Sequence, residues 1–340
     1  MTALRHGLLA APLALLVALG GPARAADLEQ TSIALPAIAL IFSSVYIAQD
    51  AGIFKKEGLE VKEQVITGIA AANAVISGSI DFSSSSGVTI TRAAARHQSL
   101  IAIANTMDHS GFWVVISKKA ADERHFDAKA PLAERAKLMK GLRFAVGAIN
   151  AIPHAYLKLI AKIGGLDGEK DIVVAGMSPP DQVGALERNA IDGFSGGPPV
   201  LDEVLLKNEA VILANGTTGD PVDPPWLAPV AANVILTRPQ FCADHKSICM
   251  KMGQSMVEAS KFMHEHPQDA MQLLAKRVNV TDPKILASAY QNTLVATPLS
   301  PALDAKMLSV ADDMNIEAGF LKPSEKLDSY DKLFTNEFVQ

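Results

Sequence analysis

Few side chains in this sequence are spaced for catalysis or metal binding. Asp108 and His109 are adjacent, and a carboxylate beside an imidazole is part of a Ser-His-Asp triad, but adjacency in sequence is not triad geometry. Methionines and histidines between Met250 and His266 could bind a soft metal; we interpret these spaced methionines as core residues of a helix. We therefore predict no catalytic residue, no metal site and no cofactor.

Cys242 and Cys249 are the only cysteines, too few for a disulfide framework or a cysteine-rich zinc site. Within one straight helix, seven residues would separate them by about 10 Å of rise, too far for a bridge. A disulfide requires Cys242 to lie just before the helix that carries Cys249, and Asp244 is a suitable start for that helix. We predict such a structural disulfide for an oxidising compartment; two free thiols are the alternative.

Three polar segments could bind a small molecule. The serines of 83–87 offer hydroxyl and N–H groups suited to a carboxylate or sulfonate, or they cap a helix. Residues 150–154 open a second helix, where His154 could donate to an anion or serve as a surface or capping residue. Residues 195–197 permit close backbone approach, or form a turn before two prolines.

The elements that would position these segments occur twice. The first set comprises strand 31–35, helix 43–51, strand 59–65, helix 70–77 and residues 80–82. About 111 residues later come strand 142–146, helix 154–163, strand 172–175, helix 181–188 and residues 191–194. Gly78 and Asn189 end equivalent helices, and both residue types tolerate a left-handed backbone. Strand–helix alternation predicts an α/β fold of two lobes, each a small mixed or parallel sheet flanked by helices.

The connections between these lobes predict a hinge and a cleft. A strand at 112–117 leaves the first lobe, a proline-rich segment at 220–229 crosses back, and 230–237 can return the chain to the first lobe. We assign 26–112 and 238–340 to lobe 1 and 113–237 to lobe 2. The last hundred residues have helical periodicity, interrupted at Pro267, Pro283 and Pro298.

In open α/β sheets, ligands bind at the carboxyl ends of the strands. We therefore place the predicted site in the loops that follow the strands. Apolar residues there, including Ile69, Met177 and Phe194, are core unless several line the cleft, in which case the ligand has an aliphatic or aromatic body. The predicted ligand-binding residues are Leu35, Ile38, Phe42, Thr67, Gly68, Ser84, Ser85, Ser86, Asn105, Asn150, His154, Ser195 and Gly196.

The first 25 residues have the pattern of a cleavable secretory signal. A basic start at Arg5 precedes an apolar run at 8–19, and Ala23-Arg24-Ala25 fits the small-x-small cleavage rule. Twelve residues make about 18 Å of helix, short of a hydrocarbon core of about 30 Å. With a formal net charge of −5 and no basic stripe, the chain is not expected to bind nucleic acid. We expect an exported protein, and the family resemblance described next implies a periplasmic monomer.

Several segments resemble the nitrate/sulfonate/taurine-type periplasmic binding proteins, a superfamily that includes binding proteins for thiamine pyrimidine precursors. They are residues 46–61, 74–82, 140–147 and 190–194, and the resemblance covers roughly residues 28–270. It implies a type II-like periplasmic-binding-protein fold that closes on one small molecule and delivers it to an ABC permease. Because no basic residue is evident in a cleft loop, we expect an organic solute, bearing a sulfonate or carboxylate if it is anionic, rather than an inorganic anion.

Two other functions use the same scaffold. One is an enzyme, related to a desulfinase with a cysteine nucleophile or to pyrimidine-precursor metabolism. Cys242 and Cys249 lie away from every predicted cleft loop, which argues against the first of these. The other is a periplasmic sensor subunit, which would use the same closure to signal to a membrane kinase.

Overall fold

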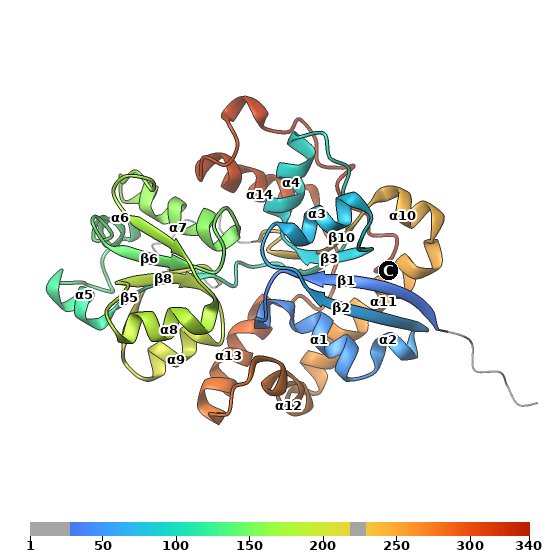
Figure 1. The fold of residues 1–340 in the computed structure, drawn as a ribbon, viewed down its shortest axis with the longest axis horizontal. Helices are drawn as coiled ribbons and strands as arrows, with labels where there is room; N and C mark the ends of the chain where they lie inside the picture. Colours follow the sequence, from blue (N-terminus) through green and yellow to red (C-terminus); the bar gives the residue numbers. More distant parts are fainter. Residues whose placement is uncertain (1–27, 218–228) are drawn as a thin grey trace, which may run out of the picture.

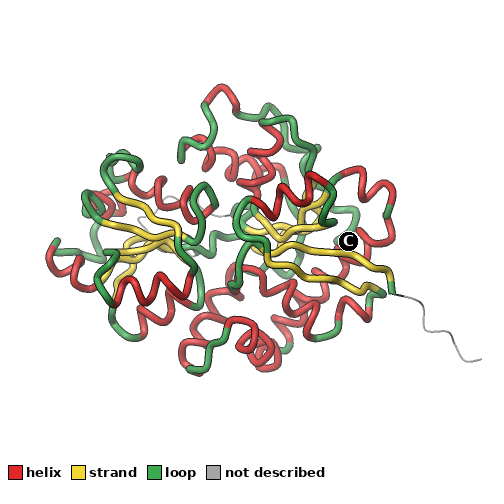
Figure 2. Tube along the Cα trace, viewed as in Figure 1, coloured by secondary structure: helices red, strands yellow, loops and turns green. Residues whose placement is uncertain are grey.

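Two five-stranded sheets with equivalent strand orders organise the chain (Figures 1 and 2). The computed structural model describes residues 28–217 and 229–340. The first sheet has the order β2-β1-β3-β10-β4, built from β1 (Glu29–Leu35), β2 (Leu59–Val65), β3 (Phe82–Ser85), β4 (Ile101–Met107) and β10 (Asn233–Thr237). The second has the order β7-β6-β8-β5-β9, built from β5 (Trp113–Ser117), β6 (Arg143–Val146), β7 (Val173–Gly176), β8 (Gly193–Gly196) and β9 (Ala210–Asn215).

The matching topologies confirm the predicted α/β duplication. In each sheet the first three strands are parallel, and the fourth, β10 or β5, runs antiparallel to both of its neighbours. The chain enters the second sheet at β5, directly after β4, and returns to the first sheet at β10. The end of lobe 2 predicted at residue 237 therefore needs correction, because Asn233–Thr237 is a strand of the first sheet. The signal at 1–25 and all but the last residue of the 220–229 crossing lie outside the described residues.

Helices cover both faces of each sheet. Those that follow the strands are α1 (Ser43–Asp50), α2 (Ile53–Lys56), α3 (Ala70–Ser77), α4 (Gly87–Ala95), α5 (Lys118–Glu123), α6 (Leu132–Lys137), α7 (Ile152–Ile163), α8 (Pro179–Glu187) and α9 (Val200–Leu206). The C-terminal helices are α10 (Pro239–Asp244), α11 (Lys246–Glu265), α12 (Pro267–Val278), α13 (Pro283–Ala296) and α14 (Ala305–Glu317). Within the described ranges, no helix combines the length and hydropathy needed to cross a bilayer.

Turn chemistry sets several of these boundaries as predicted. α12 and α13 begin at Pro267 and Pro283, where a missing N–H removes no intrahelical hydrogen bond. Gly78 and Asn189, which follow α3 and α8, both adopt a left-handed backbone, with φ of 81° and 55°. The structural equivalence expected from the two halves is therefore confirmed at these helix ends.

The predicted disulfide is present. Cys242 lies in α10 and Cys249 in α11, with their Cα atoms 5.6 Å apart. α11 begins at Lys246 rather than at Asp244, and the interruption at His245 lets the two cysteines approach. The bridge joins the first two C-terminal helices to each other, and both cysteines pack in the core of the first lobe.

Two C-terminal helices tie the lobes together. α14 packs on α4 of the first lobe and α7 of the second, and its Ala311 and Met314 share one core cluster with residues of α7 (Figure 1). α13 contacts α9 of the second lobe, where Ser288 and Asn292 donate hydrogen bonds to Asp202 at 2.6 and 2.8 Å. The two lobes are therefore bridged by these helices as well as by the strand crossings.

Candidate functional site

Loops at the ends of β2 and β6 face one another between the lobes. Gly68 follows β2 with a left-handed φ of 65°, a conformation that favours glycine. A Cβ atom at Gly68 would lie 3.6 Å from the Cβ atom of Ala148, in the loop after β6. A larger side chain at Gly68 would therefore project into the other lobe.

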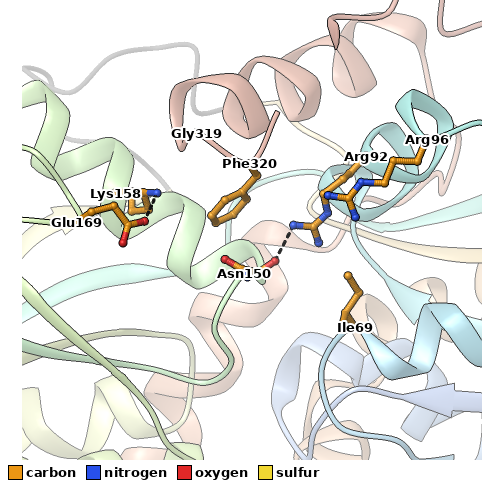
Figure 3. A pocket seen from close by; sticks show the side chains of 8 residues that line it. All are labelled: Ile69, Arg92, Arg96, Asn150, Lys158, Glu169, Gly319 and Phe320. Atoms are coloured by element: carbon orange, nitrogen blue, oxygen red, sulfur yellow. Dashed lines mark hydrogen bonds and ion pairs between the residues drawn. The ribbon is translucent and has the colours of Figure 1, made fainter. Parts of the chain in front are cut away.

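Next to these loops lies a cavity of about 270 Å³ that both lobes line (Figure 3). The first lobe contributes Ile69, Arg92 and Arg96; the second contributes Asn150, Lys158 and Glu169; Gly319 and Phe320 come from the segment after α14. Most of these side chains are polar or charged, so the cavity suits a polar ligand.

Arg92 is the most buried charged group of the cavity. It projects from α4, is 5% exposed, and donates from Nη1 to the backbone carbonyl of Asn150 at 2.9 Å, a hydrogen bond between the lobes. Its guanidinium carbon lies 5.5 Å from the centre of the Phe320 ring, within cation–π range. Burial lowers the pKa of Arg92, and the nearby charge of Arg96 lowers it further.

His154 supports the loop that meets Arg92. Its Nδ1 accepts a hydrogen bond from the backbone N–H of Asn150 at 3.0 Å, so this nitrogen carries no proton. Asn150 adopts a left-handed φ of 62°, which asparagine tolerates. Burial lowers the pKa of His154, Lys158 lowers it further, and Glu169 opposes both. A neutral His154 thus positions the carbonyl that Arg92 contacts.

Charge is distributed unequally over the two walls of the cavity. On the wall from the second lobe, Lys158 Nζ lies 2.6 Å from a carboxylate oxygen of Glu169, and 5.2 Å from the centre of the Phe320 ring. On the wall from the first lobe, Arg92 and Arg96 have no acidic side chain within ion-pair distance in the parts of the chain that are described.

The predicted ligand-binding residues fall into three groups. Six lie within the sheets or their cores, namely Leu35, Phe42, Ser84, Asn105, Ser195 and Gly196. Two are buried at helix starts, namely Ser86 and His154. Five are exposed or half-buried, namely Ile38, Thr67, Gly68, Ser85 and Asn150. Gly68 and Asn150 lie where the lobes meet; a ligand-binding role for the set stays a prediction.

Three stretches that carry predicted ligand-binding residues are in part strands. β3 continues to Ser85, β4 to Met107 and β8 to Gly196. The antiparallel strands β10 and β5 extend the hydrogen bonding along these polar segments, which short-range hydropathy cannot reveal. Ser84 consequently bonds to the side chain of Asn233 in the core, and Phe194 is a fully buried core residue. Ser86 caps α4, accepting from the N–H of Thr89 at 3.4 Å.

The hydrogen bonds of the described residues form no Ser-His-Asp triad, which the catalytic alternative would require. Residues 193–197, Gly-Phe-Ser-Gly-Gly, have the Gly-x-Ser-x-Gly spacing of a nucleophile elbow, which our sequence analysis overlooked. An elbow exposes its serine at a strand-to-helix turn, whereas Ser195 is fully buried within β8, paired with Val114 and Val146. His109 binds Asp108 at 2.6 Å on the crossing between the sheets. That hydrogen bond raises the pKa of His109.

Sequence reasoning missed Arg92, Arg96 and Phe320. Arg92 lies in α4, and Arg96, four residues later, is the residue directly after the helix, so the two lie on the same side of it, a spacing visible in the sequence. Neither arginine lies in a loop at the carboxyl end of a strand, where the predicted site was placed. Phe320 gave no local signal, because only the packing of α14 brings its segment to the cavity.

A family model described as the NMT1-like family matches residues 26–279. The chain belongs to the NMT1-like family. A comparison of this NMT1-like chain with curated proteins found no match.

Solved structures share the fold of this NMT1-like chain. A protein from Bordetella bronchiseptica RB50 aligns with a TM-score of 0.77 at 19% identity, over 92% of this chain and 96% of that one. The alkanesulfonate-binding protein SsuA from Xanthomonas axonopodis pv. citri, bound to MOPS, gives 0.68 at 17% identity over 89% and 97%. The periplasmic nitrate-binding protein NrtA from Synechocystis PCC 6803 gives 0.65 at 14% over 92% and 87%. The expected periplasmic-binding-protein fold is thereby confirmed.

Proposed function

We propose that the protein binds a small organic molecule between its two lobes, in the periplasm, and delivers it to an ABC permease of the inner membrane. The observation that carries this proposal is the cavity lined from both lobes, with the Arg92–Asn150 hydrogen bond across it. A ligand that contacts both walls favours the closed arrangement of the lobes over an open one. The sulfonate- and nitrate-binding proteins of the same fold support this class of function.

An enzyme with a cysteine nucleophile has less support. Both cysteines of the chain are joined in one disulfide, so no free thiolate is present to act as nucleophile. A sensor subunit would use the same ligand-driven closure, and a kinase as partner in place of the permease would distinguish it.

The test is thermal unfolding of the mature protein, beginning at Ala26, against alkyl and aryl sulfonates, aromatic carboxylates, pyrimidine precursors, taurine and nitrate. A ligand at a hundred times its Kd stabilises the protein by about 2.7 kcal/mol, which raises the Tm by several degrees. Small-angle scattering should report a smaller radius of gyration with the same ligand. Chemical conversion of the ligand, followed by mass spectrometry, would support the enzyme instead.

A matched pair of glycine variants tests the location. Gly68 and Gly141 both have a left-handed backbone, so leucine strains each of them similarly. A Cβ atom at Gly68 faces Ala148 of the other lobe, whereas one at Gly141 meets nothing within 4 Å. We expect Gly68→Leu to abolish the ligand-induced stabilisation and Gly141→Leu to retain it. Equal ligand binding by both variants would contradict a site between the lobes.

A further inference from the structure

Arg92 carries a buried charge that no described residue neutralises. It is 5% exposed, and its one hydrogen bond is to a backbone carbonyl. Removing a cation from water is unfavourable unless an anion or several acceptors replace the water. The charge of Arg96 acts on Arg92 and repels it. Residues 28–217 and 229–340 thus supply no counter-charge to Arg92.

The residues that line the cavity do not supply one. Glu169 is the only acidic residue among them, and its carboxylate pairs with Lys158 on the opposite wall. Figure 3 shows Arg92 and Arg96 side by side on the wall from α4, with Glu169 beyond Phe320. Two positive charges therefore remain on this wall.

The free donors of Arg92 suit an oxyanion. A guanidinium has five N–H donors in a planar fork, and one of them is used by Asn150. The remaining donors match the oxygen spacing of a carboxylate, sulfonate or phosphate group. Arg96, which is exposed and directly follows α4, adds a second cation on the same side of that helix.

Space and apolar surface are available for the rest of a ligand. The cavity of about 270 Å³ is walled in part by Ile69 and Phe320. A second cavity of about 270 Å³ adjoins it, shares Ile69, Arg92 and Arg96, and continues between α3 and α4. An anionic group on the arginines could therefore carry a small apolar body in either direction.

We infer that the interlobe cavity binds an organic anion whose charged group pairs with Arg92 and Arg96 and whose body packs on Ile69 and Phe320. This inference rests on the proposed function and narrows its ligand to an anion. Since Arg92 also contacts Asn150 of the other lobe, an anion that orders its side chain also stabilises the contact between the lobes. Arg92 is thus the specificity-determining residue for charge.

The test uses two probes with one body, benzenesulfonate and the neutral benzenesulfonamide, with inorganic sulfate as a third. Binding is measured by calorimetry, and as a thermal shift at constant ionic strength, for the wild type and for Arg92→Gln, Arg92→Lys and Arg96→Gln. Arg238→Gln is the matched control, because Arg238 also donates to backbone carbonyls and lies 5.6 Å from an aromatic ring, that of Phe241, but does not line either cavity.

We expect benzenesulfonate to bind the wild type more tightly than the sulfonamide. Arg92→Gln should weaken sulfonate binding by about 30-fold or more, Arg92→Lys less, and the exposed Arg96→Gln by about two- to fivefold. Arg238→Gln should leave the affinity unchanged. Circular dichroism spectra of all variants establish that they are folded.

Each contrary result has a separate meaning. If benzenesulfonate stabilises the wild type no more than it stabilises Arg92→Gln, or if the sulfonamide binds equally well, the anion assignment is wrong. If sulfate binds as tightly as benzenesulfonate, the inference that the ligand has an organic body packed on the cavity wall is wrong. Binding that depends on Arg92 but survives Gly68→Leu would overturn the proposed interlobe capture and leave the anion site standing.

Discussion

Two arginines that each lie over an aromatic ring are paired very differently. Arg277, on α12, lies 5.0 Å from the ring centre of Tyr46 and bonds to both carboxylate oxygens of Asp50 at 2.6 Å and to Glu63 at 2.8 Å. These carboxylates raise the pKa of Arg277. Arg92 lies similarly over Phe320, yet burial and a second arginine lower its pKa.

The difference separates a structural charge from a functional one. Arg277 joins α12 to α1 and to β2 within the first lobe, and the fold itself supplies both counter-charges. Arg92 reaches from one lobe to the other and has none in the described chain. Since the described residues pair Arg277 with two carboxylates but offer none to Arg92, we infer that the charge opposite Arg92 comes from a ligand.

The largest expected effect is on stability. Arg277→Gln should lower the free energy of unfolding by about 2–3 kcal/mol, because it leaves two partly buried carboxylates unpaired. Urea unfolding measures this change. Arg143→Gln is the control, since Arg143 pairs with Asp192 at the surface and its loss should lower the free energy of unfolding far less than Arg277→Gln does. Equal losses would remove the distinction between Arg277 and an ordinary surface pair.

Arg92→Met should behave in the opposite way. Without ligand, we expect a free energy of unfolding within about 1 kcal/mol of the wild type, or higher, because the substitution removes an unpaired buried charge and keeps an apolar stem. The same urea titration measures it. A loss above about 2 kcal/mol would mean that the fold depends on Arg92 as it does on Arg277.

Asp202 extends the comparison to a buried anion. It is 2% exposed, Ser288 and Asn292 donate to its Oδ1, and its Oδ2 has no partner in the structure. Burial raises the pKa of Asp202, so its contribution to stability is present at acid pH and is lost as the pH rises through the raised value. As the pH rises from 4 to 8, the free energy of unfolding of Asp202→Asn should therefore increase relative to that of the wild type by up to about 1 kcal/mol. Parallel pH profiles of unfolding for the two proteins would refute this.

The smallest effect concerns the support of the Arg92 contact. Because burial lowers the pKa of His154, its contribution to stability is present above the unfolded value of about 6.5 and is lost as the pH falls below it. His154→Gln retains an acceptor for Asn150 and cannot gain a proton. We expect the free energy of unfolding of this variant, measured with urea, to fall less than that of the wild type between pH 7.5 and pH 5.5. A decline as steep as that of the wild type would assign the pH dependence to other groups.

Elements bounded by turn residues were predictable from sequence. β2 and α3 match their predicted ranges because Gly58, Gly68 and Gly78 delimit them, and the disulfide was predicted from helix geometry together with the oxidising compartment that the signal implies. The ends of β3, β4 and β8 were missed because their partners β10 and β5 are remote in sequence. The cavity was missed for a similar reason: Arg92, Asn150 and Phe320 meet only after both lobes and α14 have packed.

The position of the antiparallel strand β10 between β3 and β4 has a consequence for the order of folding. β4 lies at the edge of the first sheet with β10 as its neighbour, so it cannot join that sheet until β10 (Asn233–Thr237) has been synthesised. All five strands of the second sheet lie between Trp113 and Asn215 and precede β10. Since pairing across a long intervening segment is slow, the lobe that the ribosome begins first should be the last to fold.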